Sequence, residues 1–252
     1  MNYIGIDIGS TCAKTVVLNE KKEFIQEFVQ PTGWSSVDTA EEILQKLKLA
    51  GINLSDDPSC CVATGYGRIS VPYADKAVTE ITCHALGAVH LFHQPDLTVI
   101  DIGGQDTKII QIEQGFVKDF IMNDKCAAGT GRFLEVMANT LSLRPNEMFE
   151  LARLGSDTTI SSMCTVFAES EVIGLIGKGE PKENIAYAVV DSTIRKVTAQ
   201  LSRMNGEMST FCLTGGLCEC EYIREALSKK LGKEVISSPD ARYAGAIGAA
   251  LS

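Results

Sequence analysis

Short apolar runs alternating with helical patterns predict an α/β chain. Residues 4–18 read as two apolar runs on either side of an Asp-Ile-Gly turn, and a third run, 24–28, follows the polar residues 19–22. This is the pattern of a three-stranded β-meander. Residues 39–50 then place Ile43, Leu44, Leu47 and Ala50 on one helical face, with Gly51 where a C-cap belongs.

The pattern continues through the rest of the chain. Residues 60–63 read as a strand ending in Thr-Gly-Tyr-Gly, and a helix with apolar residues at 81, 85, 88 and 92 ends near Pro95. Another helix is predicted within 182–204, a strand at 211–213 precedes Thr-Gly-Gly, and Ile223, Leu227 and Leu231 stripe a further helix. Residues 244–250, Ala-Gly-Ala-Ile-Gly-Ala-Ala, predict a helix suited either to tight packing or to a hinge between lobes.

An internal repeat organises these elements. Residues 4–18 (IGIDIGSTCAKTVVL) align with residues 98–112 (TVIDIGGQDTKIIQI), so that Asp7 falls on Asp101 and Lys14 falls on Lys108. After a two-residue difference, Phe24–Phe28 matches Phe116–Phe120. The simplest use of this duplication is a pair of similar α/β lobes that face each other.

Composition narrows the function classes. Lys and Arg number 23 against 32 Asp and Glu, a net charge of −9 with a pI near 4.9. Duplex nucleic-acid binders need a basic face, so we expect no nucleic-acid partner. The first residues, MNYIGIDIGS, do not read as an export signal, and no run of 18 apolar residues occurs. We therefore expect a cytoplasmic protein without a membrane partner.

The two Asp-Ile-Gly turns suggest phosphate chemistry. An aspartate at the end of a buried strand, followed by Gly-Ser-Thr or Gly-Gly-Gln, presents a carboxylate beside exposed backbone N–H groups. Phosphate oxygens suit the N–H groups, and Mg²⁺ suits the carboxylate through water. One such turn is usually structural, but two in register form a clamp for a polyphosphate. The Leu-Thr-Gly-Gly turn at 213–216 is a third place where the backbone is suited to approach a ligand closely.

Together these turns resemble the nucleotide-binding core of the actin, Hsp70 and sugar-kinase superfamily. The resemblance implies an α/β fold of two duplicated ribonuclease-H-like lobes, residues 1–95 with 240–252 and residues 96–239, with ATP or ADP in the cleft between them. It implies that Asp7 and Asp101 hold a hydrated Mg²⁺ and polarise the attacking water. The nucleotide-binding residues that it implies are Gly9, Ser10, Thr11, Lys14, Gly103, Gly104 and Gln105 at the phosphates and Gly215 and Gly216 under the nucleoside.

Glu80 lies where this superfamily keeps a polar residue near the attacking water, and a solvated helix charge is the simpler interpretation. His84, one turn later, is expected on the helix surface or between the lobes. Arg68 and Arg132 could contact phosphate, a cofactor or a partner.

Two of the nine cysteines stand out. Cys126 lies in a small-residue loop before an amphipathic helix, and Cys164 precedes a similar segment 38 residues later. Helix N-termini favour thiolates, which would suit metal ligands, although an unpaired cysteine is more often a small buried apolar residue. An iron–sulfur cluster needs four thiolates, and a symmetric dimer would supply them.

The segments KCAAGTGRF and MCTVFAESEV, with DIGGQDTK and TGYGR, resemble the activator components of 2-hydroxyacyl-CoA dehydratases, relatives of the benzoyl-CoA reductase ATPase subunits. The resemblance implies a homodimer with one bridging 4Fe-4S cluster, bound by Cys126 and Cys164 of each subunit. ATP hydrolysis would drive one electron, received from ferredoxin or flavodoxin, onto a partner dehydratase. The other seven cysteines are expected to be structural.

Three alternatives remain open at this point. The partner could be a double-cubane or benzoyl-CoA-type reductase in place of a dehydratase. A small-molecule kinase could use the same scaffold, although 252 residues leave little room for a specificity insertion. A non-catalytic scaffold controlled by nucleotide is the third possibility.

Overall fold

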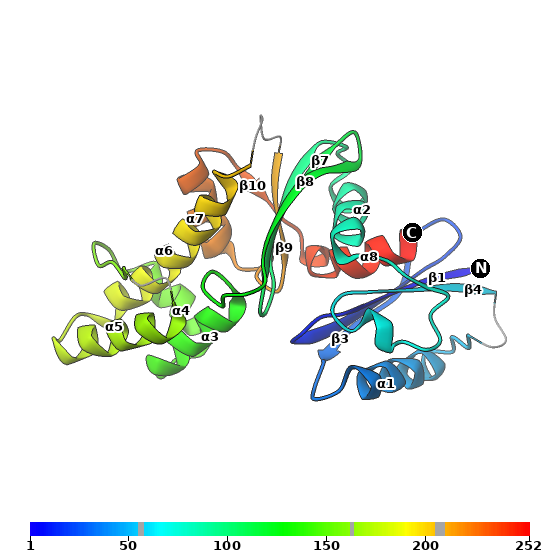
Figure 1. Cartoon of the computed structure of the whole chain (residues 1–252), viewed down its shortest axis with the longest axis horizontal. Helices are drawn as coiled ribbons and strands as arrows, with labels where there is room; N and C mark the ends of the chain where they lie inside the picture. The colour runs from blue at the N-terminus through cyan, green and yellow to red at the C-terminus, as the bar shows by residue number, and fades with distance from the viewer. Residues whose placement is uncertain (55–57, 162–163, 205–209) are drawn as a thin grey trace. The chain divides into compact units, whose positions relative to one another are not determined.

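Two five-stranded sheets form the framework of the protein, and both have the same strand order. The computed structural model describes residues 1–54, 58–161, 164–204 and 210–252 (Figure 1). The first sheet has the order β3-β2-β1-β4-β5 and the second β10-β9-β6-β7-β8. In each sheet the strand that comes first in the chain, β1 or β6, lies at the centre. The next two strands of the chain lie on one side of it, and the two later strands lie on the other. The α/β class and the duplicated meander are therefore confirmed.

The strands of the first sheet are β1 (Asn2–Ile8), β2 (Cys12–Leu18), β3 (Phe24–Pro31), β4 (Ser59–Thr64) and β5 (Lys76–Ala77), and those of the second are β6 (Leu97–Ile102), β7 (Thr107–Glu113), β8 (Phe116–Asn123), β9 (Thr210–Gly215) and β10 (Val235–Ile236). The chain divides into two units: unit 1 comprises Met1–Leu97, Ile112–Lys118 and Asp240–Ser252, and unit 2 comprises Thr98–Gln111 and Asp119–Pro239.

The register of β1 places Asp7 between two neighbouring strands. In the antiparallel pair with β2, Asp7 lies opposite Lys14, and in the parallel pair with β4 it lies opposite Thr64. Side chains alternate between the faces of a strand, so Gly5 and Asp7 share one face and Ile4, Ile6 and Ile8 share the other.

Helix α1 (Ser36–Leu49) covers the isoleucine face of the first sheet. Ile43 and Leu47 pack in one cluster with Ile4 and Ile6. The Ser35 side chain caps the helix by accepting a hydrogen bond from the backbone N–H of Asp38 at 3.3 Å. A short 3₁₀ turn, η1 (Arg68–Ser70), follows β4.

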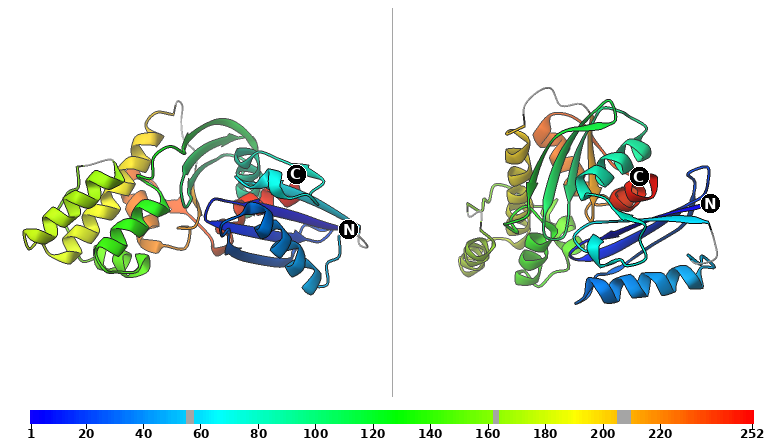
Figure 2. Two further views of the ribbon diagram at one scale, coloured as in Figure 1. Left: turned by 60° about the horizontal axis from the view of Figure 1, so that its bottom comes forward. Right: turned by 45° about the vertical axis from the view of Figure 1, so that its right-hand side comes forward.

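Helices α2 (Glu80–Phe92) and α8 (Ala244–Leu251) lie on the opposite face of this sheet (Figure 2). The backbones of α2, α8 and β1 approach one another closely, because glycine occupies three positions at which a Cβ would overlap the backbone of a neighbouring element. A Cβ on Gly5 would overlap Ala246, one on Gly87 would overlap Ala244, and one on Gly248 would overlap Cys83. This supports the interpretation of the small-residue helix as a closely packed element.

Among its described residues, unit 2 contains five α-helices: α3 (Gly131–Thr140), α4 (Pro145–Ala152), α5 (Thr165–Gly177), α6 (Lys182–Leu201) and α7 (Glu221–Leu231). They share one hydrophobic core with Ile100, Ile102 and Ile109 of the second sheet. The 3₁₀ turn η2 (Pro239–Tyr243) precedes α8. Within the described part of the chain, no helix has both the length and the apolar character needed to cross a bilayer.

The packing of α8 generates a stability prediction. Gly248→Ala forces a methyl group into the backbone of Cys83, and we expect the free energy of unfolding to fall by about 3 kcal/mol. Gly174→Ala is the control, because nothing lies within 4 Å of the new Cβ and alanine favours a helix. Urea denaturation followed by circular dichroism measures both variants. Equal stability of the two variants would contradict the close packing.

Candidate nucleotide site and cysteine pair

In unit 1, the first Asp-Ile-Gly turn follows a buried strand end. Asp7 is only 3% exposed, whereas Ser10 and Thr11 at the tip of the turn are exposed. The backbone N–H of Gly9 donates to the carbonyl of Cys12 at 3.1 Å, and the Thr32 hydroxyl donates to the Gly9 carbonyl at 2.7 Å. These bonds hold a glycine turn whose tip is open to a ligand beside a buried carboxylate.

The second turn, in unit 2, repeats this arrangement. Asp101 is 2% exposed at the end of β6, and Gly103, Gly104 and Gln105 follow it. The backbone N–H of Gly103 donates to the carbonyl of Asp106 at 2.9 Å, as Gly9 does to Cys12. Gln105 is exposed at the tip of the turn.

A Thr-Gly pair lies beside each aspartate. Gly65 follows Thr64 with φ +84°, and a Cβ there would overlap Asp7 Oδ1. Gly215 follows Thr214 with φ +83°, and a Cβ there would lie 2.8 Å from Asp101 Oδ1. Both glycines are therefore required by backbone conformation and by the space that the carboxylate occupies. The similarity of the two units therefore includes the Thr-Gly turns at Gly65 and Gly215, which lie outside the aligned meanders.

The two aspartates have different charged neighbours. Lys108 is 1% exposed, and its Nζ lies 3.2 Å from Asp101 Oδ2 and 2.9 Å from Asp106 Oδ2. The Thr214 hydroxyl donates to Asp101 Oδ1 at 2.8 Å. Lys14, the repeat partner of Lys108, is half-buried on β2 opposite Asp7. Lys108 and Thr214 are site residues that sequence reasoning missed, although the aligned lysines gave the signal.

The histidine of α2 does not lie on the helix surface, so that part of the expectation for it was wrong. His84 is 4% exposed, and its Nε2 lies 4.0 Å from Asp7 Oδ2 and 3.7 Å from Glu80 Oε1. Glu80 is the first residue of α2, and its side chain is 24% exposed. Unit 1 therefore brings Asp7, His84 and Glu80 together.

These residues fit a hydrated magnesium ion and a polyphosphate. Carboxylate oxygens are hard ligands of the kind Mg²⁺ takes, commonly through water, and glycine turns offer backbone N–H groups to phosphate. Gly245 supports the fit, since a Cβ there would lie 2.5 Å from Asp7 Oδ2. Asp7 would hold the ion through water, and the chemistry the ion supplies is neutralisation of phosphate charge.

Both arginines considered from the sequence make local bonds. Arg68 Nη1 donates to the Gly65 carbonyl at 3.0 Å, which braces the Thr-Gly turn. Arg132 Nη1 pairs with Glu135 Oε2 at 2.8 Å on the surface of α3.

The Cys126 loop is held through its carbonyl groups. The Asn123 amide donates to the Cys126 carbonyl at 2.7 Å and to the Ala128 carbonyl at 3.2 Å. The Thr130 hydroxyl donates to the Ala127 carbonyl at 2.6 Å. Helix α3 begins at Gly131, so Cys126 lies in the small-residue loop before the helix, as predicted, five residues ahead of its first residue. The run of small residues that includes Gly129 (φ +84°) keeps the loop outside the helix.

Cys164, in contrast, is the N-cap of α5 and is exposed. Nearby, the backbone N–H of Ser161 donates to Glu171 Oε1 at 3.0 Å, which ties the preceding segment to the helix. Ser162 and Met163 of the same motif lie outside the described residues.

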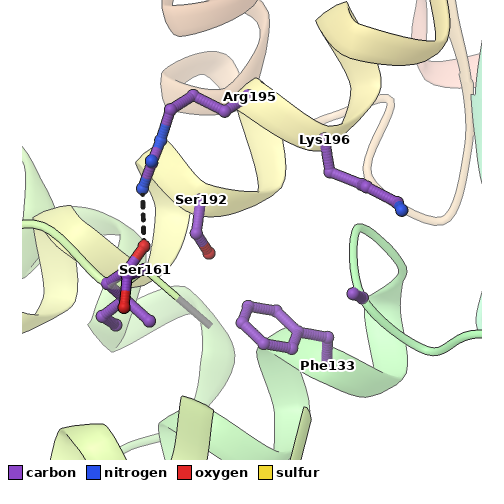
Figure 3. Close-up of a pocket in the computed structure, with 7 residues that line it drawn as sticks. Phe133, Ser161, Ser192, Arg195 and Lys196 are labelled. Carbon is purple, nitrogen blue, oxygen red and sulfur yellow. Dashed lines mark hydrogen bonds between the residues drawn. The ribbon is translucent and has the colours of Figure 1, made fainter. Parts of the chain in front are cut away.

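A small cavity lies between the two cysteine-bearing segments, and residues of both line it. It measures about 30 Å³ and is lined by Ala128 of the Cys126 loop, Ile160 and Ser161 before Cys164, and side chains of α3 and α6 (Figure 3). Such a volume holds water but not a nucleotide. Arg195 of α6 donates from Nη2 to the Ile160 carbonyl at 2.9 Å. Residues from both segments therefore line the same cavity of unit 2.

Burial distinguishes several of the other thiols from this pair. It raises the pKa of Cys61 to about 12, and it raises the pKa values of Cys83, Cys212 and Cys220 as well. A buried thiol with a raised pKa stays protonated and is a poor ligand or nucleophile near neutral pH. Cys126 is half-buried and Cys164 is exposed.

The two units, each with a buried strand-end aspartate, a glycine turn and a Thr-Gly pair, define an ATPase of the actin, Hsp70 and sugar-kinase fold. The family model of the BadF/BadG/BcrA/BcrD ATPases matches residues 4–252. The chain belongs to this family.

Individual relatives agree with this assignment. The chain is 43% identical over 251 residues to the (R)-2-hydroxyglutaryl-CoA dehydratase activating ATPase of Acidaminococcus fermentans, covering 98% of this chain and 95% of that protein. The structure of the activator of the 2-hydroxyisocaproyl-CoA dehydratase from Clostridium difficile with bound ADPNP superposes with a TM-score of 0.89 at 34% identity, covering 100% of this chain and 93% of that one. A glucokinase from Streptomyces griseus, with a TM-score of 0.61 and 16% identity over 99% of this chain and 98% of its own, shows the fold alone.

Lys108 generates a prediction about stability. Lys108→Met leaves two carboxylates without their buried cation, and we expect the free energy of unfolding to fall by about 3 kcal/mol. Lys14→Met, at the matched position of unit 1, should change it by less than about 1 kcal/mol, because Lys14 is half-buried and more solvated. Urea denaturation compares the two variants, and equal losses would argue against a buried ion network at Asp101.

The thiols generate a prediction about pH. Since alkylation requires the thiolate, Cys61, with a pKa raised to about 12, should react slowly in the folded protein throughout pH 7–9, whereas exposed Cys164 reacts readily. Iodoacetamide labelling of the cluster-free protein, followed by peptide mass spectrometry, measures both rates. Labelling of the urea-unfolded chain is the control, in which the two rates should converge. Rapid labelling of Cys61 in the folded state would contradict its burial.

Proposed function

We propose that this protein is an ATP-dependent one-electron donor that activates a partner 2-hydroxyacyl-CoA dehydratase. The observation that carries the proposal is the pair of ligand-capable thiols, Cys126 and Cys164, on two segments that line one cavity of an ATPase unit. A kinase of the same fold has no use for such a pair.

ATP binding is the first part of the proposal. The tips of the two glycine turns, Ser10 with Thr11 and Gly104 with Gln105, would contact the phosphates, with Lys14 near the first turn. Gly215 and Gly216 would lie under the nucleoside. Asp7 and Asp101 would orient a hydrated Mg²⁺ and the attacking water, with Glu80 as a proton acceptor through water.

Cluster binding is the second part, and the donor set supports a dimer. Among the described residues, no group of three or more His, Cys, Asp and Glu side chains is placed to hold a metal. Four thiolates therefore require Cys126 and Cys164 from two copies of the chain. When bound, a 4Fe-4S cluster would supply reversible one-electron transfer. Lys196, whose side-chain stem lies against Gly129, and Arg195 line the cavity beside the two cysteine-bearing segments.

The surface next to Cys164 suits a second copy. Helix α5 buries only Ala168 and Val172, while Val166, Phe167, Ile173 and Ile176 are 46–67% exposed. An apolar face of this kind is a usual sign of an interaction site. An isologous dimer would cover apolar surface close to the two ligand pairs.

The identity of the partner rests on the relatives. A dehydratase activator is 43% identical over nearly the whole chain, which favours a dehydratase over a double-cubane or benzoyl-CoA-type reductase. Ferredoxin or flavodoxin would supply the electron. The partner carries the acyl-CoA site and therefore determines the final substrate.

Anaerobic purification tests the proposal. We expect about four irons and four sulfides per two chains, a dimeric mass, and ATP hydrolysis by the same preparation. Cys126→Ala and Cys164→Ala should each lose the iron but retain ATP binding, because neither residue lies in the glycine turns. Cys60→Ala is the control, since this half-buried thiol on β4 should not affect the iron content.

Two results would overturn the proposal. Iron-free wild-type protein prepared without oxygen would exclude the cluster. A Cys126→Ala variant that keeps full activity in phosphorylating a small molecule would identify a kinase.

A further inference from the structure

The second phosphate turn is bonded directly to the start of the helix that follows Cys126. The Gly131 N–H donates to the Gly103 carbonyl at 2.9 Å, and the Arg132 N–H donates to the Gly104 carbonyl at 2.8 Å. All four residues belong to unit 2. A movement of the turn can therefore be transmitted to α3 through these two hydrogen bonds, within a single unit.

Peptide geometry connects the N–H groups of the turn to the carbonyl groups that hold α3. In a trans peptide the carbonyl and the following N–H point in opposite directions from one rigid plane. The Gly103 carbonyl shares its plane with the Gly104 N–H, and the Gly104 carbonyl shares its plane with the Gln105 N–H. If phosphate binds these two N–H groups, it fixes the same peptide planes that hold α3.

A third bond ties the turn to the Cys126 loop itself. Thr107, the first residue of β7, is fully buried, and its hydroxyl donates to the Gly129 carbonyl at 2.7 Å. With the bonds from Asn123 and Thr130, this bond completes a set in which every carbonyl from Cys126 to Gly129 accepts a hydrogen bond. Thr107 alone of these donors lies on the strand that follows the phosphate turn.

We propose that Thr107 is a positioning residue that couples phosphate binding at Gly103–Gln105 to the Cys126 loop. The inference rests on the proposed ATP site. Without the hydroxyl, the buried Gly129 carbonyl has lost its bond to β7, and the loop is no longer held to the turn. Bound nucleotide would then still fix the Gly103–Gln105 turn, but the conformation of the Cys126 loop would no longer depend on it.

Hydrogen exchange in the full-length protein tests the coupling, with ADP and Mg²⁺ as the probe. In the wild type, ADP should slow amide exchange in peptides that cover residues 103–105 and also in peptides that cover 124–132. In Thr107→Val the first effect remains, whereas the nucleotide response at 124–132 falls about fivefold or more. Thr107→Ser, which keeps the hydroxyl, should restore the response.

The matched control is Thr98→Val. Thr98 is also fully buried in the second sheet, and its hydroxyl has no hydrogen-bond partner among the described residues, so its loss should leave both responses unchanged. Thr107→Ala serves as a second variant if Thr107→Val does not fold.

The outcomes separate the inference from the proposed function. If wild-type protein shows no protection at 103–105, the ATP site fails and the inference falls with it. If protection appears there but exchange at 124–132 does not change, or if Thr107→Val responds like the wild type, only the coupling is overturned.

Discussion

The burial of one carboxylate at the end of the first strand of each unit is the constraint on which the rest of the structure depends. A buried charge is costly unless hydrogen bonds or an opposite charge compensate it. The space around Asp7 excludes a Cβ at Gly65 and Gly245, and Asp101 takes a hydroxyl from Thr214 and an ammonium from Lys108. Gly65, Gly215 and Gly245 leave room for the two carboxylates, and the buried lysine supplies Asp101 with an opposite charge.

The duplicated units have diverged at this shared feature. The Lys108 ammonium lies 3.2 Å from Asp101, whereas the group beside Asp7 is the imidazole of His84, at 4.0 Å. In unit 2 the aspartate therefore belongs to an ion network that also includes Asp106 of the second glycine turn. The first aspartate instead shares its surroundings with His84 and Glu80, and Glu80 Oε1 lies 3.7 Å from His84 Nε2.

Much of the fold was accessible from the sequence, because strand alternation, helical periodicity and the repeat are local or self-referential patterns. The two sheets and the main helices were predicted on this basis. The burial of His84 and the ion network of Lys108 were not, because they depend on the packing of α2 against α8 and on the bond from Thr214 to Asp101, which join residues more than a hundred positions apart in the chain. The iron–sulfur cluster, the dimer and the roles of the site residues stay predictions.

Helix α8 also constrains how the chain reaches its native state during synthesis. Its eight residues cover the face of the first sheet that carries Gly5 and Asp7, yet the ribosome makes them after the whole of unit 2. At roughly 5–20 residues per second, about 9 to 35 s pass between the synthesis of the last strand of this sheet and the completion of α8. The earliest strands are thus among the last to be completed, and a nascent chain must keep them from pairing wrongly while its middle portion folds.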